Sequence, residues 1–545
     1  VILPRNKQEG DKIPVSAFAG REDGTYPTDT TKYEKRGIAL EVPQWDPDKC
    51  LQCNLCSFVC PHTVFRPSLL TEKEMAEAPE KVRADAREAK GHKEQYFYMG
   101  FSPLDCTGCG NCINICPAKE KALNMVPLEQ SNANEGPVWE WIKDRENQVF
   151  SRDRLTVKES QFLTPYFEFS GACAGCGETP YAKLVTQLFG DRMMISNSAG
   201  CTTVWGGSAP VVPYKKDKKG HGPAWGFSLF EDNGEYGLGM YLGYQTVRQE
   251  VKEKAESLKQ ELVREKKTES RLYQALCNWQ DGSEQGQGAR ERADELIKAL
   301  VESPESEAAK ELYKRRDFLI KRSNWVFGGD GWAYDIGYGG LDHVLSTGAD
   351  INIMVFDTEV YSNTGGQASK ATPLAAVAKF SAAGKRRKKK ELGMMAMQYG
   401  DVYVAQVAMG ADPKQTLKAL LEAESYPGPS LIIGYAPCIN HGIKRGMSHT
   451  QEQQKLAVDA GYWNLYRYDP RRKAKGENPF VLDSKEPKGN FREFLMSEVR
   501  FTSLLKKQPD IAEQLLEQAE DDAKERYERY KRKSEEKVQL RNVKR

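Results

Sequence analysis

The sequence has almost no net charge, little histidine and no long apolar run. Its 545 residues include 79 Lys and Arg against 77 Asp and Glu, so no general attraction to nucleic acid or to anionic membranes is expected. No apolar stretch approaches the roughly 20 residues that a membrane helix needs, and the start lacks a secretory signal pattern. The 6 histidines are scattered without the spacing of metal ligands. These shortages argue against a membrane-spanning or nucleic-acid-binding protein.

Cysteine, by contrast, is abundant, with 13 residues. In a secreted chain such a number would suggest disulfides, but without a signal peptide the spacing indicates metal ligation in a reducing compartment. We therefore expect a cytoplasmic location or another reducing, low-oxygen compartment. The chain begins at Val1 and not at Met, which leaves open that it is a piece of something longer, trimmed or incomplete.

Eight of the cysteines form two copies of the pattern C-x2-C-x2-C-x3-C, each followed by proline at Pro61 or Pro117. This spacing is typical of two-cluster ferredoxins, in which the fourth cysteine of each run ligates the other 4Fe–4S cluster. The alternative is a pair of zinc knuckles, which the doubled spacing and both prolines disfavour. The predicted ligand sets are Cys50, Cys53, Cys56 and Cys116 for one cluster and Cys106, Cys109, Cys112 and Cys60 for the other.

Two glycine-rich turns each follow a short apolar run in the second half of the chain. GGDGWAYDIGYGG (328–340) comes after a run ending at Phe327, and DTEVYSNTGGQ (357–367) follows INIMVF. Each alone could be an ordinary turn, but a GDG and an Asn-bearing turn about thirty residues apart look like the signature of a thiamine-diphosphate site. Mg²⁺ prefers hard oxygen ligands, and the candidates are the Asp330 carboxylate, the Thr358 hydroxyl and the Val360 carbonyl. The other cofactor-binding candidates are Gly329, Gly331, Trp332, Glu359, Tyr361, Ser362 and Asn363, the glycines because they let backbone approach the phosphates.

Length and pattern together predict a chain of several domains. Apolar runs at 351–357, 401–410 and 430–437 alternate with helical stretches, which favours a parallel sheet flanked by helices. We expect an irregular linking segment (1–44), a small α+β two-cluster ferredoxin-like domain with its connection (45–150), and an α/β thiamine-diphosphate-binding domain (151–545). Residues 245–322 are strongly charged and helical, and 508–545 are predicted to form an exposed charged helix.

These motifs, with CAGCGETPY (173–181), AKFSAAGK (378–385) and GYAPCINHGI (434–443), closely resemble pyruvate:ferredoxin (flavodoxin) oxidoreductases from about residue 24 onward. The resemblance implies that the chain is the C-terminal portion, or one subunit of a split enzyme, and that the first half of the family's chain is absent. It also implies a third 4Fe–4S cluster near the thiamine ring. From the residues alone, Cys173 and Cys176 form a pair for which a structural zinc site or a redox-active Cys-x-x-Cys is the less favoured alternative. The residues that the family supplies are Cys173, Cys176, Cys201 and Cys438 as ligands, Glu178 and Cys201 beside the cofactor, and Asn363 facing the substrate.

The activity that the resemblance implies is the oxidation of pyruvate with coenzyme A to acetyl-CoA and CO₂. Electrons would pass from thiamine diphosphate through three 4Fe–4S clusters to ferredoxin or flavodoxin. The complete enzyme would be a homodimer, and this chain alone would be inactive because a carboxylate of the absent half activates the thiamine. Two alternatives stay open: a ferredoxin oxidoreductase for another 2-oxoacid, and a pure electron-transfer protein with a thiamine-like scaffold. The basic run KRRKKK (385–390) is interpreted as a solvated loop or a docking patch for an acidic ferredoxin, and Cys277 as an ordinary free thiol.

Overall fold

The computed structural model describes residues 1–147, 155–208 and 211–537. Its largest element is an eight-stranded sheet in the order β13-β12-β10-β11-β9-β8-β6-β7. The six strands from β10 to β7 pair in parallel, and β12 and β13 extend one edge antiparallel. The strands are β6 (Met193–Asn197), β7 (Ala224–Phe227), β8 (Ser323–Gly329), β9 (Asn352–Asp357), β10 (Tyr403–Val407), β11 (Ser430–Tyr435), β12 (Tyr466–Tyr468) and β13 (Phe480–Leu482).

The central strands are apolar along their whole length because both faces of the sheet are buried. In β9, Ile353 and Val355 join one hydrophobic core, whereas Met354 and Phe356 join the other. The two cores also take up apolar side chains from the flanking helices, which are α8 (Thr179–Phe189), α14 (Tyr338–Ser346), α15 (Leu392–Ala396), α16 (Pro413–Glu424), α17 (Thr450–Asp459), α18 (Phe491–Met496), α19 (Val499–Lys507) and α20 (Pro509–Glu535). The predicted fold class, a mostly parallel sheet flanked by helices, is confirmed.

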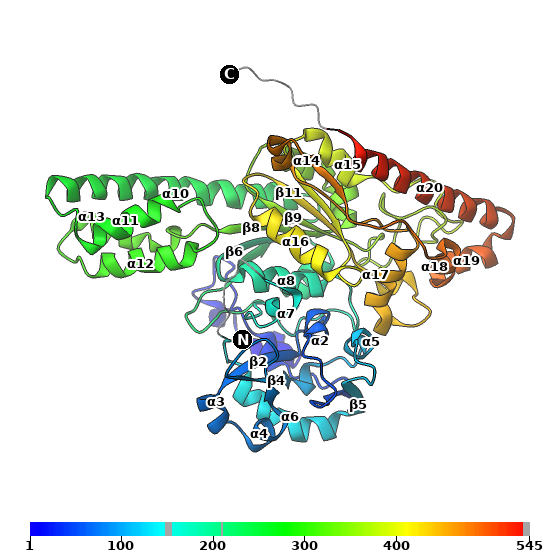
Figure 1. Cartoon of the computed structure of the whole chain (residues 1–545), viewed down its shortest axis with the longest axis horizontal. Helices are drawn as coiled ribbons and strands as arrows, with labels where there is room; N and C mark the ends of the chain where they lie inside the picture. The colour runs from blue at the N-terminus through cyan, green and yellow to red at the C-terminus, as the bar shows by residue number, and fades with distance from the viewer. Residues whose placement is uncertain (148–154, 209–210, 538–545) are drawn as a thin grey trace.

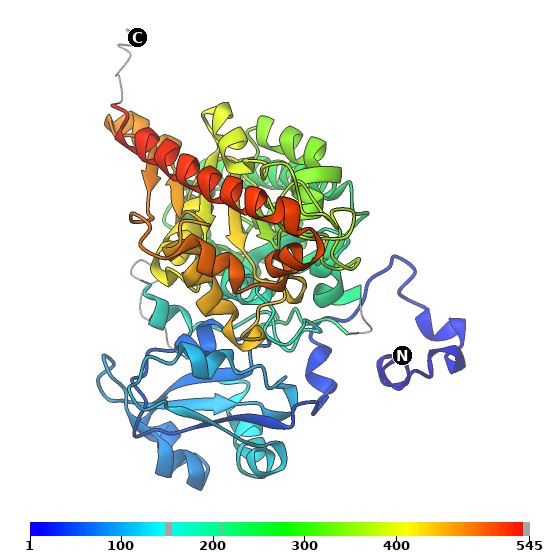
Figure 2. The same cartoon turned by 90° about the vertical axis from the view of Figure 1, so that its right-hand side faces the viewer.

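The cysteine-rich part forms a small α+β unit below this sheet (Figure 1). The antiparallel pair β1 (Glu41–Trp45) and β5 (Leu123–Pro127) and the three-stranded sheet β2-β4-β3 surround one hydrophobic core. The remaining strands and helices of this part are β2 (Phe65–Thr71), β3 (Arg87–Glu88), β4 (Gln95–Phe101), α2 (Leu55–Phe58), α3 (Glu72–Ala76), α4 (Glu80–Asp85), α5 (Asn111–Ile115), α6 (Leu128–Ile142) and α7 (Val157–Ser160). The N-terminal segment with α1 (Ile2–Asn6) lies to one side of this unit (Figure 2). Asn111 Nδ2 donates to Thr450 Oγ1 at 2.9 Å and Asn114 Nδ2 to the Ser448 carbonyl at 2.8 Å, so α5 is tied to the sheet domain.

The charged region 245–322 is helical, as predicted, and projects from the sheet as an arm (Figure 1). It is inserted between β7 and β8 and has a hydrophobic core of its own, built around Leu258, Leu276 and Trp279. The helices of the arm are α10 (Asn233–Arg264), α11 (Arg271–Asp281), α12 (Ala289–Val301) and α13 (Glu307–Lys314).

The prediction of an exposed tail helix is wrong for one face of α20. Leu516, Ala519 and Tyr530 are buried in the core on one side of the sheet, and the helix lies across the domain (Figure 2). The charged residues of α20 occupy its remaining faces, which made the apolar stripe easy to overlook. The end of the predicted tail, 538–545, lies outside the described residues. In the described part of the chain, no helix combines the length and apolarity needed to cross a membrane.

Candidate functional site

The two ferredoxin-type runs have the same backbone shape. Gln52 and Asn54 in the first run have φ of 57° and 60°, and Gly108 and Gly110 in the second have 67° and 79°. These left-handed residues lie at equivalent positions, flanking the second cysteine of each run. They turn amide groups toward sulfur: Gln52 N–H donates to Cys50 Sγ and Gly108 N–H to Cys106 Sγ, both at 3.3 Å. Such hydrogen bonds stabilise thiolates and tune the reduction potential of a cluster that the thiolates bind.

The structure also pairs each run with the fourth cysteine of the other. Cys60 lines one small cavity, of about 20 Å³, together with Cys106, Cys109 and Cys112. In the other group, burial raises the pKa of the Cys56 thiol, and so do the neighbouring thiols of Cys50, Cys53 and Cys116. Among the described residues, no three Cys, His, Asp or Glu side chains converge as closely as a single metal ion requires. Zinc ligation needs such convergence, whereas a cubane spaces its four thiolates around four irons.

Four further cysteines meet in a cavity of about 200 Å³ in the sheet domain: Cys173, Cys176, Cys201 and Cys438. They come from three separate loops, and two of these loops touch backbone to backbone. A Cβ atom added at Gly177 would lie 2.6 Å from the Pro437 nitrogen, so this position needs glycine. Glu178 N–H donates to Cys176 Sγ at 3.4 Å. Cys277, on α11 of the arm, lines none of these cavities.

A second cavity, of about 300 Å³, adjoins the first at the carboxyl ends of β8 and β9. It is lined by Gly329, Asp330, Gly331 and the turn 360–364. Both cavities share four lining residues, which are Glu178, Cys201, Ser362 and Asn363. Ligands bind at the carboxyl ends of parallel strands as a general rule, and here the thiols and the glycine-rich turns meet at that edge.

Three oxygens converge beside Asp330. Thr358 Oγ1 lies 2.9 Å from Asp330 Oδ1 and 3.1 Å from the Val360 carbonyl oxygen. Glu359, between them, has φ of 61°, and this left-handed turn lets the Thr358 side chain and the Val360 carbonyl point the same way. Burial and the Asp357 carboxylate raise the pKa of Asp330, so the ionised carboxylate is disfavoured at this position. A bound divalent cation would remove this penalty. The oxygens therefore suit Mg²⁺.

Sequence reasoning missed two side chains at this site. Ser369 Oγ donates to Asp330 Oδ2 at 2.6 Å, and Trp205 Nε1 donates to Glu178 Oε2 at 2.6 Å. Burial raises the pKa of Glu178 to about 7, so this carboxyl can gain or lose a proton near neutral pH. Neither Ser369 nor Trp205 stands in a motif that a single sequence reveals.

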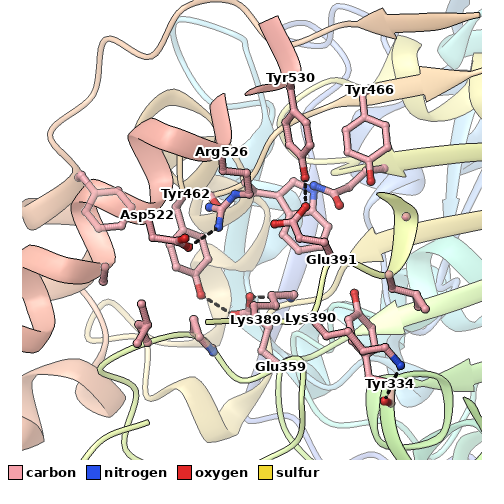
Figure 3. Close-up of a pocket in the computed structure, with 18 of the residues that line it drawn as sticks. Tyr334, Glu359, Lys389, Lys390, Glu391, Tyr462, Tyr466, Asp522, Arg526 and Tyr530 are labelled. Carbon is pink, nitrogen blue, oxygen red and sulfur yellow. Dashed lines mark hydrogen bonds and ion pairs between the residues drawn. The ribbon is translucent and has the colours of Figure 1, made fainter. Parts of the chain in front are cut away.

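Two predicted cofactor-binding residues do not line the cavities. The Trp332 side chain is buried in a hydrophobic core. Glu359 points into a different, small cavity of about 50 Å³, where its carboxylate meets Lys389 at 2.9 Å and the Tyr462 hydroxyl at 2.6 Å (Figure 3). The same carboxylate also pairs with Arg500 at 2.8 Å. Lys389 also pairs with Asp357 at 2.7 Å. These buried ion pairs hold both sides of Thr358 in place.

Several lysines of the basic run 385–390 bind groups within the sheet domain. Lys389 is only 15% exposed, Lys390 Nζ donates to the Tyr334 carbonyl at 3.1 Å, and Lys385 Nζ donates to the Ser369 carbonyl at 2.5 Å. Lys388 pairs at the surface with Asp522 of α20 at 2.7 Å. The interpretation as a solvated loop or docking patch is thus wrong for Lys389, whereas Arg386, Arg387 and Lys388 are exposed.

Comparisons with known proteins agree with this arrangement. Three families match: a domain of unknown function over residues 1–39, a 4Fe-4S double cluster binding domain over 49–119, and the C-terminal thiamine pyrophosphate binding domain of thiamine pyrophosphate enzymes over 314–433. The last two fall within the domains predicted for 45–150 and 151–545, whose boundaries stay predictions. The fold and the matched families define a chain with a 4Fe–4S cluster domain followed by a thiamine pyrophosphate-binding domain.

The particular relatives are more specific. The chain is 55% identical, over 98% of its length, to a pyruvate-flavodoxin oxidoreductase from Klebsiella pneumoniae and 54% identical to a pyruvate:ferredoxin oxidoreductase from Moorella thermoacetica. The predicted family is confirmed: the chain is a homologue of these oxidoreductases and spans 45% of their length. A 2-oxoglutarate:ferredoxin oxidoreductase from Magnetococcus marinus aligns at 14% identity and a TM-score of 0.30, covering 54% of this chain and 72% of that one. This similarity is too low to support a conclusion about the chain.

The buried ion pairs give a testable prediction. Lys389→Met leaves Asp357 buried without its cation and Glu359 with Arg500 alone, and we expect a loss of about 3–5 kcal/mol in the local free energy of unfolding at β9. Amide hydrogen exchange of that strand measures the loss. Lys388→Met removes a neighbouring lysine whose side chain is 59% exposed, and a change of at most about 0.5 kcal/mol is expected. Equal exchange rates in the two variants would contradict the anchoring role of Lys389.

Proposed function

We propose that this chain is the electron-transferring, thiamine-binding part of a pyruvate:ferredoxin or pyruvate:flavodoxin oxidoreductase. The reaction of the whole enzyme would convert pyruvate and coenzyme A into acetyl-CoA, CO₂, two electrons and a proton. The observation that carries the proposal is that the four-cysteine cavity and the Asp330 cavity share Glu178, Cys201, Ser362 and Asn363. A cluster and a thiamine ring bound there would be neighbours, as direct electron transfer requires.

The diphosphate end of the site is supported by the chemistry of its oxygens. Asp330, Thr358 and the Val360 carbonyl would hold Mg²⁺, and Gly329 and Gly331 would let the backbone approach the phosphates. Ser369 would keep the Asp330 carboxylate oriented through its hydrogen bond. When bound, thiamine diphosphate supplies the electron sink that decarboxylation of a 2-oxoacid needs.

The substrate end is formed by Asn363 and Glu178. Asn363 lines both cavities and would donate a hydrogen bond to the substrate. Glu178, whose carboxylate accepts a hydrogen bond from Trp205 Nε1, would lie beside the cofactor at the same point. The predicted role of Asn363 rests on the family resemblance, and its place between the two cavities supports it.

The electron path would lead from the third cluster to the two ferredoxin-type clusters and then to a soluble acceptor. Cys173, Cys176, Cys201 and Cys438 would hold the first, and the two crossed sets of four cysteines would hold the others. The grouping of Cys60 with Cys106, Cys109 and Cys112 supports this assignment. The absent half, coenzyme A and a second copy of the whole enzyme remain the proposed partners.

Iron content tests the third cluster. Chain purified without oxygen should contain about twelve irons, four for each cube. Cys438→Ser should lower the content to about eight, because one ligand of the sheet-domain cluster is lost. Cys277→Ser, which changes a thiol on the arm, should keep all twelve. About eight irons in the unaltered chain would overturn the three-cluster proposal.

Cofactor retention tests the magnesium site. In the complete enzyme, Asp330→Asn removes the carboxylate charge at the three converging oxygens, so thiamine diphosphate affinity should fall at least about tenfold, in line with the loss of a metal-site residue. Asp335→Asn is the matched control, because Asp335 pairs with Lys370 at 2.7 Å outside the cavity. Fluorescence titration with Mg²⁺ and thiamine diphosphate gives both affinities. Unchanged affinity in Asp330→Asn would rule out the predicted ligand.

A further inference from the structure

A lysine is buried where the sheet domain meets the cysteine-rich part. Lys183, in the middle of α8, has 0% of its surface exposed. Its Nζ donates to the carbonyl oxygens of Ser57 and Phe58, the latter at 3.2 Å, and to Gln161 Oε1 at 3.0 Å. Two of these partners belong to α2, and α8 lies between that helix and the sheet (Figure 1).

The three partners match a charged lysine. An ammonium group has three N–H donors and no acceptor, whereas a neutral amine has only two donors. All three partners of Lys183 are acceptors, so the ammonium can use all three of its donors at once. Within the part of the chain that the structure describes, no carboxylate pairs with Lys183. A buried charge without a counter-charge in the polypeptide is costly, and an anionic group bound nearby would offset that cost.

The nearest source of negative charge is the pair of ferredoxin-type clusters. Ser57 and Phe58 lie between Cys56 and Cys60, each of which is a proposed ligand of a different cube. Burial lowers the pKa of Lys183 to about 7 in the polypeptide alone, whereas Cys60 and then Cys56 raise it, so negatively charged clusters bound at these cysteines would favour the ammonium form. Lys183 is thus positioned to sense the charge of both cubes through a region from which water is excluded.

We propose that the Lys183 ammonium raises the reduction potentials of the two ferredoxin-type clusters and so draws electrons out of the sheet domain. Reduction adds one negative charge to a cube, and a fixed buried cation stabilises the reduced form over the oxidised one. The inference rests on the proposed clusters and deepens the proposed function, since it assigns a positioning residue to the electron path.

The place of Lys183 on α8 fits this role. The helix begins at Thr179, three residues after Cys176 of the sheet-domain cavity, and Lys183 follows one turn later. A proposed ligand of the first cluster therefore precedes this helix by three residues, and the helix itself carries a cation on the side of the proposed ferredoxin-type clusters. A fixed charge at this point makes electron transfer away from the thiamine site more favourable than the reverse.

The experiment is a redox titration of the 545-residue chain, followed by electron paramagnetic resonance. In Lys183→Met the midpoint potentials of the ferredoxin-type clusters should become more negative, with the reduction equilibrium falling at least about tenfold, or 59 mV for one electron. Lys121→Met is the matched control. Lys121 donates to the carbonyl of a proposed ligand, Cys116, at 2.6 Å, but its side chain is exposed. Solvent screens its charge, so little shift is expected.

A second variant keeps the test decisive if Lys183→Met binds less iron. Gln161→Glu places a carboxylate of the same size beside the ammonium, and its charge should cancel that of Lys183 and lower the potentials in the same direction. Full iron content with unchanged midpoints in the variants would overturn this inference and leave the proposed function standing. A chain without ferredoxin-type clusters would overturn the proposed function itself.

Discussion

Parallel pairing of β11, β9, β8 and β6 is the constraint on which the site depends. Since the four strands run in the same direction, the loops that follow them open at one edge of the sheet. Those loops carry Cys438, the 357–367 turn, the 328–340 turn and Cys201, in that order across the sheet. Segments more than two hundred residues apart in sequence therefore line two cavities that touch. No cysteine or carboxylate has to reach across the domain, because the sheet brings them together.

Charge is the second organising feature, and it is handled differently in the two halves of the molecule. Behind the Asp330 oxygens, carboxylates are paired with Lys389 and Arg500, so the turn that presents Thr358 is fixed by ion pairs within the protein. At the junction with the cysteine-rich part, Lys183 meets only neutral acceptors. The first arrangement is complete in the polypeptide. The second would be balanced by the proposed anionic clusters nearby.

How far the sequence predicted these features depends on the range of the contacts. The ferredoxin-type cysteines and the two glycine-rich turns are local patterns, because a cluster or a phosphate needs ligands close together in the chain. Cys201 and Cys438 stand alone in the sequence, and only the family resemblance linked them to Cys173. Ser369, Trp205 and Lys183 act through contacts between distant segments, which no spacing reveals. The buried face of α20 was missed because charged residues outnumber its apolar stripe.

The arm formed by α10 to α13 affects how the chain unfolds. Its hydrophobic core is separate from both cores of the sheet domain, and the cysteine-rich part has yet another. Such units can open one at a time, with free energies that differ from one unit to the next. A single melting temperature therefore has no clear meaning for this chain. Partial unfolding of the arm could pass unnoticed in an activity assay, while leaving a cleavable, aggregation-prone species in solution.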